Sequence, residues 1–319
     1  MIVAGAGMSG LLAACMLRNE CSSILEAQPC LPNNHSAVLR FRSTAVSDIL
    51  NIPFKKVTVM KAIQPWRNPV AEAMAYSVKC NGHASMRSIS SGMGKVDRYI
   101  APQNLVQQMA NMCSPQSAGV GAIDFGLCLD IGLIQGNGEP IISTLPMPML
   151  MKMLEWETKS QFRSVSGFNL TCTLQEVEAY CSVYVPEPTH PYSRVSITDN
   201  RLIVEIPDPH SQFAEDEFST RRELHRRIIQ DARMHLGVLG VECLHDDIEC
   251  RRQKYAKILP IDENERQRFI LWATEKHNVY SLGRFATWRP GLLLDDVVND
   301  VRVIHRLANG ATQYEAKKK

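Results

Sequence analysis

The sequence contains no run of 18 or more apolar residues, the length that a helix needs to cross a membrane. It also has no charged start followed by an apolar segment and a small-residue cleavage site, so we expect neither a secretory signal nor a membrane partner. Its excess of positive charge is small, with 35 Lys and Arg residues against 33 Asp and Glu residues. Proteins that bind nucleic acid through broad electrostatics carry a larger excess, so the overall charge gives no support for that class.

The chain also lacks a Cys-x-x-Cys motif, although it contains ten cysteines. These cysteines are scattered, and a chain of 319 residues buries enough apolar surface to fold without disulfides. We therefore expect reduced thiols and a cytoplasmic location. In the segment 243–250 the spacing of Cys243, His245 and Cys250 matches no usual zinc pattern. The sequence therefore predicts no metal site.

What the sequence does contain is a β-α-β signature at its start. Residues 1–4 predict a strand, and residues 11–17 predict a buried helix. Between them the chain reads Gly-Ala-Gly-Met-Ser-Gly from Gly5 to Gly10. A second short strand, residues 22–25, ends at Glu26. Strand, glycine turn, helix, strand and acid in this order are typical of half of a parallel α/β sheet.

The glycine turn fits the phosphate-binding turn of dinucleotide-binding proteins. Gly5 permits a tight turn, Gly7 lets the backbone approach a pyrophosphate, and Gly10 lets the helix pack closely on the strand. The N-terminus of the helix offers unsatisfied N–H groups and a positive dipole end to the phosphates. Glu26, at the end of the second strand, can accept hydrogen bonds from a ribose diol. The predicted dinucleotide-binding residues are Gly5, Gly7, Met8, Ser9, Gly10 and Glu26.

The rest of the chain does not continue as regular β-α-β units. The middle predicts antiparallel strands at 170–174, 180–185, 194–198 and 201–206, with a hairpin turn at Asp199-Asn200. Further strands are predicted at 38–42, 56–60, 140–146 and 279–282, and helices at 102–112, 149–156, 220–236 and 292–307. A simple NAD-binding domain would repeat β-α-β units over roughly 150 residues. A long site built from both ends of the chain suits FAD instead.

Four segments carry a resemblance: Met1–Glu26, Ile142–Pro146, Val183–Pro186 and Tyr280–Arg289, the last with the pattern Gly-Arg-x-x-x-Trp-Arg. They resemble the amine-oxidase-type flavoproteins, and among these most of all the UDP-galactopyranose mutase-like branch. The resemblance implies FAD as the cofactor. It implies that Gly283 and Arg284 lie by the flavin diphosphate and ribityl chain, and that Arg289 and Asp296 lie near the flavin or its ribityl hydroxyls.

The predicted fold is therefore α/β, with a Rossmann-like FAD-binding domain of the glutathione reductase type and an inserted antiparallel-sheet substrate domain. The FAD-binding domain is discontinuous and takes residues 1–60, 100–150 and 255–319. The substrate domain takes residues 61–99 and 151–254.

The sequence departs from the family after its second strand. The family usually has a Gly-Gly-Arg or Gly-Gly-Asn turn there, whereas residues 27–34 of this chain read Ala-Gln-Pro-Cys-Leu-Pro-Asn-Asn. Arg40 and Arg42 are the candidates to replace those contacts. At 319 residues the chain is also shorter than typical members, which implies that much of the helical substrate lid is trimmed.

Flavin-dependent oxidation of an amine needs placement of the substrate more than an acid–base pair, because the C–H bond must lie near the flavin and water must be controlled. Aromatic side chains facing the ring would position the substrate, and the candidates are Tyr255, Tyr184 and Trp288. We therefore expect an FAD-dependent oxidoreductase that oxidises a C–N bond of a small-molecule amine or amino-acid-like substrate.

Other functions stay open. A UDP-galactopyranose mutase-like enzyme would use the flavin without net oxidation, and a non-catalytic flavin-binding protein would keep only the fold. A narrower version of the first hypothesis takes an amino-acid adduct on a modified thymidine of phage DNA as the substrate. The arginine pairs at 221–222, 226–227 and 251–252 would suit such a modified-nucleotide or DNA partner. The oligomeric state is also open.

Overall fold

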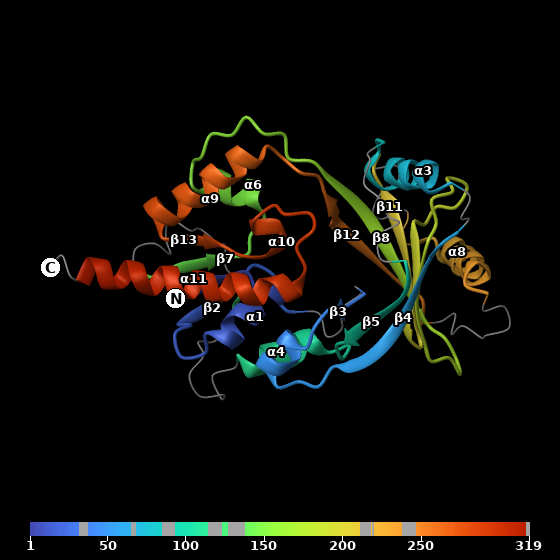
Figure 1. Ribbon diagram of the computed structural model, residues 1–319, viewed down its shortest axis with the longest axis horizontal. Coiled ribbons are helices and arrows are strands. Elements are labelled where there is room, and N and C mark those ends of the chain that lie inside the picture. The colour runs from blue at the N-terminus through green and yellow to red at the C-terminus, as the bar shows by residue number, and fades with distance from the viewer. Residues whose placement is uncertain are drawn as a thin grey trace.

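The computed structural model describes residues 1–31, 38–64, 68–84, 93–113, 123–126, 138–210, 218, 220–237 and 247–316. Its strands form two sheets that lie toward opposite ends of the long axis of the molecule (Figure 1). Helix α11 (Leu294–Ala316) runs along the first sheet, and both chain ends lie on that side (Figure 1).

In the described part of the chain, five strands form a parallel sheet in the order β13-β7-β1-β2-β6. The strands are β1 (Ile2–Ala4), β2 (Ser23–Glu26), β6 (Ile123–Phe125), β7 (Ile141–Ser143) and β13 (Val279–Ser281). β1 lies between β2 and β7, so Val3 is paired with Ile24 on one side and with Ile142 on the other. β13 adds to the far side of β7. β1, near the start of the chain, and β13, near its end, are therefore separated by β7 alone.

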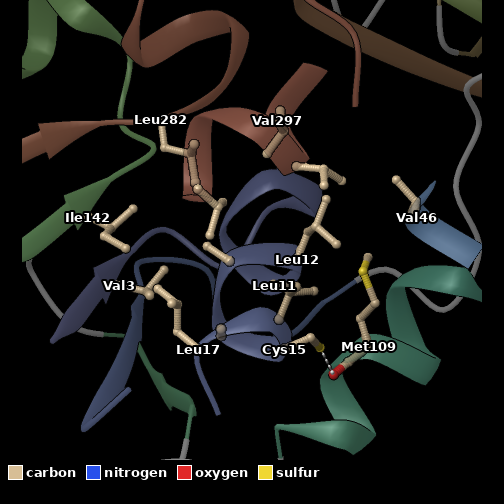
Figure 2. Packing of buried hydrophobic residues seen from close by; sticks show 14 of the residues in the cluster. Val3, Leu11, Leu12, Cys15, Leu17, Val46, Met109, Ile142, Leu282 and Val297 are labelled. Carbon is tan, nitrogen blue, oxygen red and sulfur yellow. Dashed lines mark hydrogen bonds between the residues drawn. The ribbon is translucent and has the colours of Figure 1, made fainter. Parts of the chain in front are cut away.

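Helices cover both faces of this sheet, and the alternation of buried side chains along each strand decides which helices pack on which face. On one face Val3 and Ile142 belong to the same buried cluster as Leu11 and Leu12 of α1 (Figure 2). The helices of this face are α1 (Met8–Met16), α2 (Ala45–Leu50), α4 (Leu105–Met112) and α11. The other face packs against α6 (Met147–Met153), α9 (Glu263–His277) and the short α10 (Gly283–Ala286).

Eight strands of the described residues form the second sheet, in the order β12-β8-β11-β10-β9-β4-β5-β3. Neighbouring strands are antiparallel except β4 and β9, which are parallel. The strands are β3 (Arg40–Phe41), β4 (Lys55–Ile63), β5 (Gly94–Ile100), β8 (Ser164–Thr173), β9 (Ala179–Tyr184), β10 (Arg194–Asp199), β11 (Arg201–Asp208) and β12 (Glu249–Ile258).

The two faces of the second sheet differ in polarity. One face is apolar, and Ile228 and Ile229 of α8 (Arg222–His235) are buried against it. The opposite face carries buried polar side chains, which include Asn169, Thr171, Ser182 and Ser196. Helix α3 (Pro69–Asn81) also packs on this sheet and contacts β11. The polar face is the one that the β3 side chain of Arg40 reaches.

The predicted β-α-β start, the antiparallel middle and the later strand–helix unit are all present, so the α/β prediction is confirmed. The predicted hairpin is also confirmed, because Thr198 pairs with Arg201 and Asp199 adopts a positive φ of 61°. The sequence pattern did not predict α2, α3, β5, β12 and α9. Among the helices of the described residues, none combines the length and the apolar character that crossing a bilayer requires.

The predicted domain boundaries stay a prediction. The change from the first sheet to the second comes earlier in the chain than residue 60, since both β3 and β4 belong to the second sheet. The second sheet also extends to Ile258 through β12. β12 belongs to the second sheet because it pairs with β8 along nearly the whole length of that strand.

Candidate functional site

The two ends of the chain meet at the carboxyl edge of the parallel sheet, as the sequence predicted. Gly283 follows β13 with a positive φ of 86°, and a Cβ added there would lie 2.6 Å from the Oγ of Ser9. Such contact leaves no space for a side chain at position 283. The turn after β1 and the turn after β13 therefore lie directly against each other and form one wall of a cavity.

The three glycines of the first turn have three different surroundings. Gly5 has a φ of 101°, and an added Cβ would lie 2.3 Å from the Oγ1 of Thr144. At Gly10 an added Cβ would lie 1.9 Å from the carbonyl oxygen of Gly5, so the helix packs on the turn through bare backbone. At Gly7 no atom lies within 4 Å of the added Cβ. The backbone at Gly7 is thus open for a ligand, which is the role that the sequence predicts for it.

Helix α1 presents its N-terminal N–H groups at this opening. Gly7 is its N-cap, and no side chain of the described residues caps it. The first N–H groups of a helix have no partner within the helix, and together with the helix dipole they attract phosphate. The start of α11 is different, because Asp296 accepts a hydrogen bond from the N–H of Leu293 at 2.9 Å. The phosphate-binding features are therefore concentrated at α1.

Glu26 stands at the end of β2 beside this turn. One carboxylate oxygen accepts the N–H of Ala6 at 2.7 Å, and the other accepts the N–H of Gln28 at 2.9 Å. The side chain is half-buried, and each oxygen still has acceptor capacity. Glu26 therefore fixes the glycine turn and can also accept a hydrogen bond from a diol.

The cavity has a volume of about 560 Å³ and is partly open to solvent. Ligand sites commonly have volumes of about 300–1,000 Å³ and mainly apolar linings. The lining comes from both sheets and from α11: Gly7–Ser9, Val38–Phe41, Thr144, Gln253–Ala256, Leu282–Phe285, Leu292–Asp295 and Val297. A long ligand can thus run from the glycine turn to β12. Thr144, Gln253 and Leu292–Leu294 were not predicted; only the place of Thr144 at the carboxyl edge of the sheet signals a role.

The predicted arginines take different places. Arg284 lines the cavity, with its guanidinium 5.5 Å from the ring centre of Phe285. Arg289 pairs with Asp300 at 3.6 Å, and Arg42 pairs with Asp296 at 3.1 Å. Arg289 and Asp296 line a neighbouring pocket of about 210 Å³. The structure thus brings Arg284 to the glycine turn, and their roles toward a cofactor stay predictions.

Arg40 also lines the cavity, but its guanidinium points to the second sheet. It donates to the carbonyl oxygens of Cys181 at 2.9 Å and Ile197 at 2.7 Å, and to the hydroxyls of Ser182 at 2.8 Å and Thr198 at 2.9 Å. Burial, with the nearby positive charge of Arg194, lowers the pKa of Arg40 to about 10. These contacts, on strands β9 and β10, differ from the expected position beside the turn after β2.

The polar face of the second sheet carries more positive than negative charge near Arg40. Burial is the main cause that lowers the pKa of Lys61, and the positive charges of Arg98, Arg40 and Arg194 lower it further. Arg194 forms a double hydrogen bond with Glu205. The positive charges of Arg40, Lys61 and Arg98 near this ion pair make this part of the face suited to an anionic group.

Of the three aromatic candidates, only Tyr255 lines the large cavity. Its ring lies 5.6 Å from that of Phe285. Tyr184 lies on the polar face of the second sheet, 5.7 Å from the ring of Tyr76 on α3. Trp288 is 2% exposed, and its Nε1 donates to the carbonyl oxygen of Leu259 at 2.8 Å, so it packs in the core beside α9.

The expectation about metals has two parts in the structure. In the segment 243–250, residues 243–246 lie outside the described residues. Elsewhere the structure brings together His190, Asp231 and His235, which the sequence analysis did not combine. Only the spacing of Asp231 and His235, four residues apart in a predicted helix, could have indicated this cluster.

Comparison with known proteins shows which proteins have a similar fold. No protein family and no curated protein matches the sequence, whereas solved structures match almost the whole chain. Reduced UDP-galactopyranose mutase matches with a TM-score of 0.67 and 15% identity, over 98% of this chain and 94% of that one. The chain has the fold of the FAD-binding flavoproteins.

Two further structures agree with this fold. An oxidoreductase from Methanosarcina mazei matches with a TM-score of 0.55 and 12% identity, over 96% of this chain and 99% of that one. Aklavinone-11 hydroxylase, solved with FAD and aklavinone, matches with a TM-score of 0.50 and 11% identity, over 96% of this chain and 61% of that one. At such identities the likeness concerns the fold alone.

Proposed function

We propose that this chain is an FAD-dependent oxidoreductase. The observation that carries the proposal is the open backbone at Gly7, beside the uncapped start of α1, in a cavity built from both ends of the chain. A flavoprotein fold supports it. The residues fit the cofactor: Gly7 and the first N–H groups of α1 would hold its diphosphate, and Glu26 its adenosine ribose. FAD, when bound, supplies two-electron redox chemistry at its ring.

The residues of this chain would bind, orient and shield. Arg284, at the junction with β13, supplies positive charge along the cavity wall. Leu292, Leu293 and Tyr255 line the apolar part of the cavity and would limit the access of water to a ligand bound there. No acid–base pair is needed for oxidation at a C–N bond, so a cavity that mainly positions its ligand is compatible with an amine or amino-acid-like substrate.

The test begins with the visible absorption spectrum of the purified protein and its FAD content per chain. Under anaerobic conditions an amine substrate should bleach the flavin bands, and air should then restore them with release of hydrogen peroxide. Protein that takes up no flavin would refute the proposal and favour a non-catalytic role for the fold. Flavin that binds but is bleached by none of a panel of amines would leave FAD binding intact and refute the C–N chemistry.

A second candidate is a UDP-galactopyranose mutase-like reaction without net oxidation. The cations of the polar face, among them Arg40 and Lys61, favour it because a sugar nucleotide carries a diphosphate. The near-complete coverage of a mutase structure also supports it. Turnover of UDP-galactopyranose that requires chemically reduced flavin and releases no peroxide would favour this candidate over amine oxidation.

The phage DNA version of the first proposal differs in its dependence on salt. Several of the arginines that suggested it are paired: Arg227 with Glu223 at 3.4 Å and Arg251 with Glu249 at 3.0 Å. Activity on an oligonucleotide that carries an amino-acid adduct should fall steeply with added salt if phosphate contacts hold the substrate. Activity that does not change with salt would refute the phage DNA version.

A cytoplasmic location of the protein stays a prediction.

A further inference from the structure

Three side chains of the kind that bind transition metals converge on the second sheet, at a place outside both the large cavity and the pocket beside it. His190 lies in the segment between β9 and β10, and Asp231 and His235 lie on α8. Their ligand atoms all lie within 4.8 Å of one another. The closest pair is the Nδ1 of His190 and an Oδ of Asp231, at 2.7 Å.

Both elements that carry these side chains are anchored in the same apolar core. Asp231 and His235 are four residues apart, so they project from one side of α8. Ile228 and Ile229, on the same helix, are 5% and 0% exposed and hold it against the sheet. On the other element Tyr192, two residues after His190, is fully buried. Packing of both elements against the core therefore holds the three side chains near one another.

A fourth possible ligand atom, the hydroxyl oxygen of Tyr192, lies at the same point. The hydroxyl of Tyr192 is 2.8 Å from Asp231 Oδ2, 2.8 Å from His235 Nδ1 and 3.4 Å from His190 Nδ1. A tetrahedral zinc ion with bonds of about 2.0 Å has ligands about 3.3 Å apart. The observed separations lie on both sides of this value, so shifts of side chains alone would bring the four groups to an ion.

The charges also suit a divalent cation. Two imidazoles and one carboxylate give one negative charge, and the ligand set of nitrogen and oxygen is one that zinc accepts. The ammonium of Lys79 lies 6.0 Å from the centre of the Tyr192 ring. It donates to the carbonyl oxygens of Val185 at 2.8 Å and Glu187 at 2.6 Å, so it does not occupy the carboxylate of Asp231.

Solvent reaches the cluster. The side chains of His190 and Asp231 are 21% and 31% exposed, whereas Tyr192 closes the inner side. An ion can thus enter from outside and meet a buried floor. We propose that His190, Asp231 and His235 form a binding site for one zinc-type divalent ion, with the oxygen of Tyr192 as fourth ligand. The ion would tie the β9–β10 segment to α8, and the proposal does not rest on the flavin.

The test uses the full chain without a histidine tag, stripped with a chelator and then titrated with zinc chloride against a coloured zinc indicator. We expect one equivalent to bind per chain and to raise the thermal midpoint. Cobalt(II) in place of zinc should give the visible absorption of a tetrahedral complex. Failure of the unmodified chain to take up one equivalent of zinc would overturn the proposal, whatever the variants do.

His190→Gln and the double variant with His235→Gln locate the site. The single variant should weaken zinc binding by at least about 100-fold, and the double variant should abolish it. A matched control is His305→Gln, because His305 also pairs with a single carboxylate, that of Glu20, at 2.6 Å, but belongs to no group of metal-ligand side chains among the described residues. Circular dichroism checks that each variant is folded. Zinc bound equally well by the folded double variant would refute the assignment.

Discussion

Substitution of Gly7 separates ligand binding from folding. The residue has an ordinary extended conformation, with a φ of −67° and a ψ of 174°, and an added Cβ meets no atom within 4 Å. Gly7→Val should therefore change the free energy of unfolding by no more than about 1 kcal/mol. The two methyl groups of the valine side chain would occupy the space through which the diphosphate must approach the backbone. Loss of one charge-assisted hydrogen bond to phosphate costs about 1.5–3 kcal/mol.

That free energy corresponds to a rise of about 10- to 150-fold in the Kd for FAD. The assay is equilibrium binding of FAD to stripped protein, together with urea unfolding of the same samples. Gly310→Val is the matched control, because position 310 is equally open and lines neither the large cavity nor the pocket beside it. It should leave both FAD binding and stability near those of the unmodified chain.

Gly10→Ala should differ from Gly7→Val by lowering the stability of the protein. Its Cβ would lie 1.9 Å from the carbonyl oxygen of Gly5, so the turn itself must move. We expect a loss of stability of about 3 kcal/mol or more. A Gly7→Val protein that is folded and binds FAD with an unchanged Kd would refute the binding role of Gly7. A Gly7→Val protein that is unfolded as Gly10→Ala is would refute the open surroundings of position 7.

Three further predictions concern the surroundings of the site. Hydrogen bonds from Ser160 and Thr158 hold the pKa of the buried Glu265 carboxyl below its usual range, so its stabilisation is present above pH 4.3 or so and is lost as the pH falls through the lower folded-state pKa. Glu265→Gln should accordingly lower the urea midpoint clearly at pH 7 and little at pH 3. Thr144→Val removes a hydroxyl that donates to the carbonyls of the glycine turn at 3.0 and 3.1 Å, and should cost about 1 kcal/mol in urea unfolding. Cys30 is the exposed cysteine among those described, so Cys30→Ser should remove one fast-reacting thiol from a titration with a disulfide reagent of the native protein.

The parts of the site that the sequence predicted are those with strong local constraints. Gly5 and Gly10 stand where the turn has no space for a side chain, and Gly283 repeats the same constraint after β13. Such positions are visible in a single sequence because only glycine satisfies them. The meeting of the two turns was expected from the family resemblance and from the length of an FAD site, and the order of the parallel strands places both turns at one edge of the sheet.

The missed elements have weak periodicity. In α9 the buried side chains are Glu265, Phe269 and Ala273, a stripe only one residue wide that contains a charge. Its start was nevertheless readable, since the side chain of Asp262 accepts the N–H of Glu265 in a capping pattern. Strand β12 reads Glu-Cys-Arg-Arg-Gln-Lys-Tyr-Ala-Lys-Ile and lies at a sheet edge, where charged side chains hide the alternation of a strand.

Other features depend on contacts between distant parts of the chain. The sequence offers no reason for Arg40 to turn from β3 to strands β9 and β10. In the same way, His190 meets Asp231 and His235 only because α8 folds back onto the sheet. Local pattern predicts which elements form, whereas the partners of long polar side chains depend on the tertiary arrangement.

The meeting of Ser9 with Gly283 has a consequence for biosynthesis. A ribosome adds about 5–20 residues per second, so on the order of 15–60 s pass between the emergence of these two positions. During that time the glycine turn is present on the nascent polypeptide without the turn after β13, which completes the same wall of the cavity. Binding of FAD is therefore expected to follow translation of β13. Chains that stall before β13 should be released without FAD.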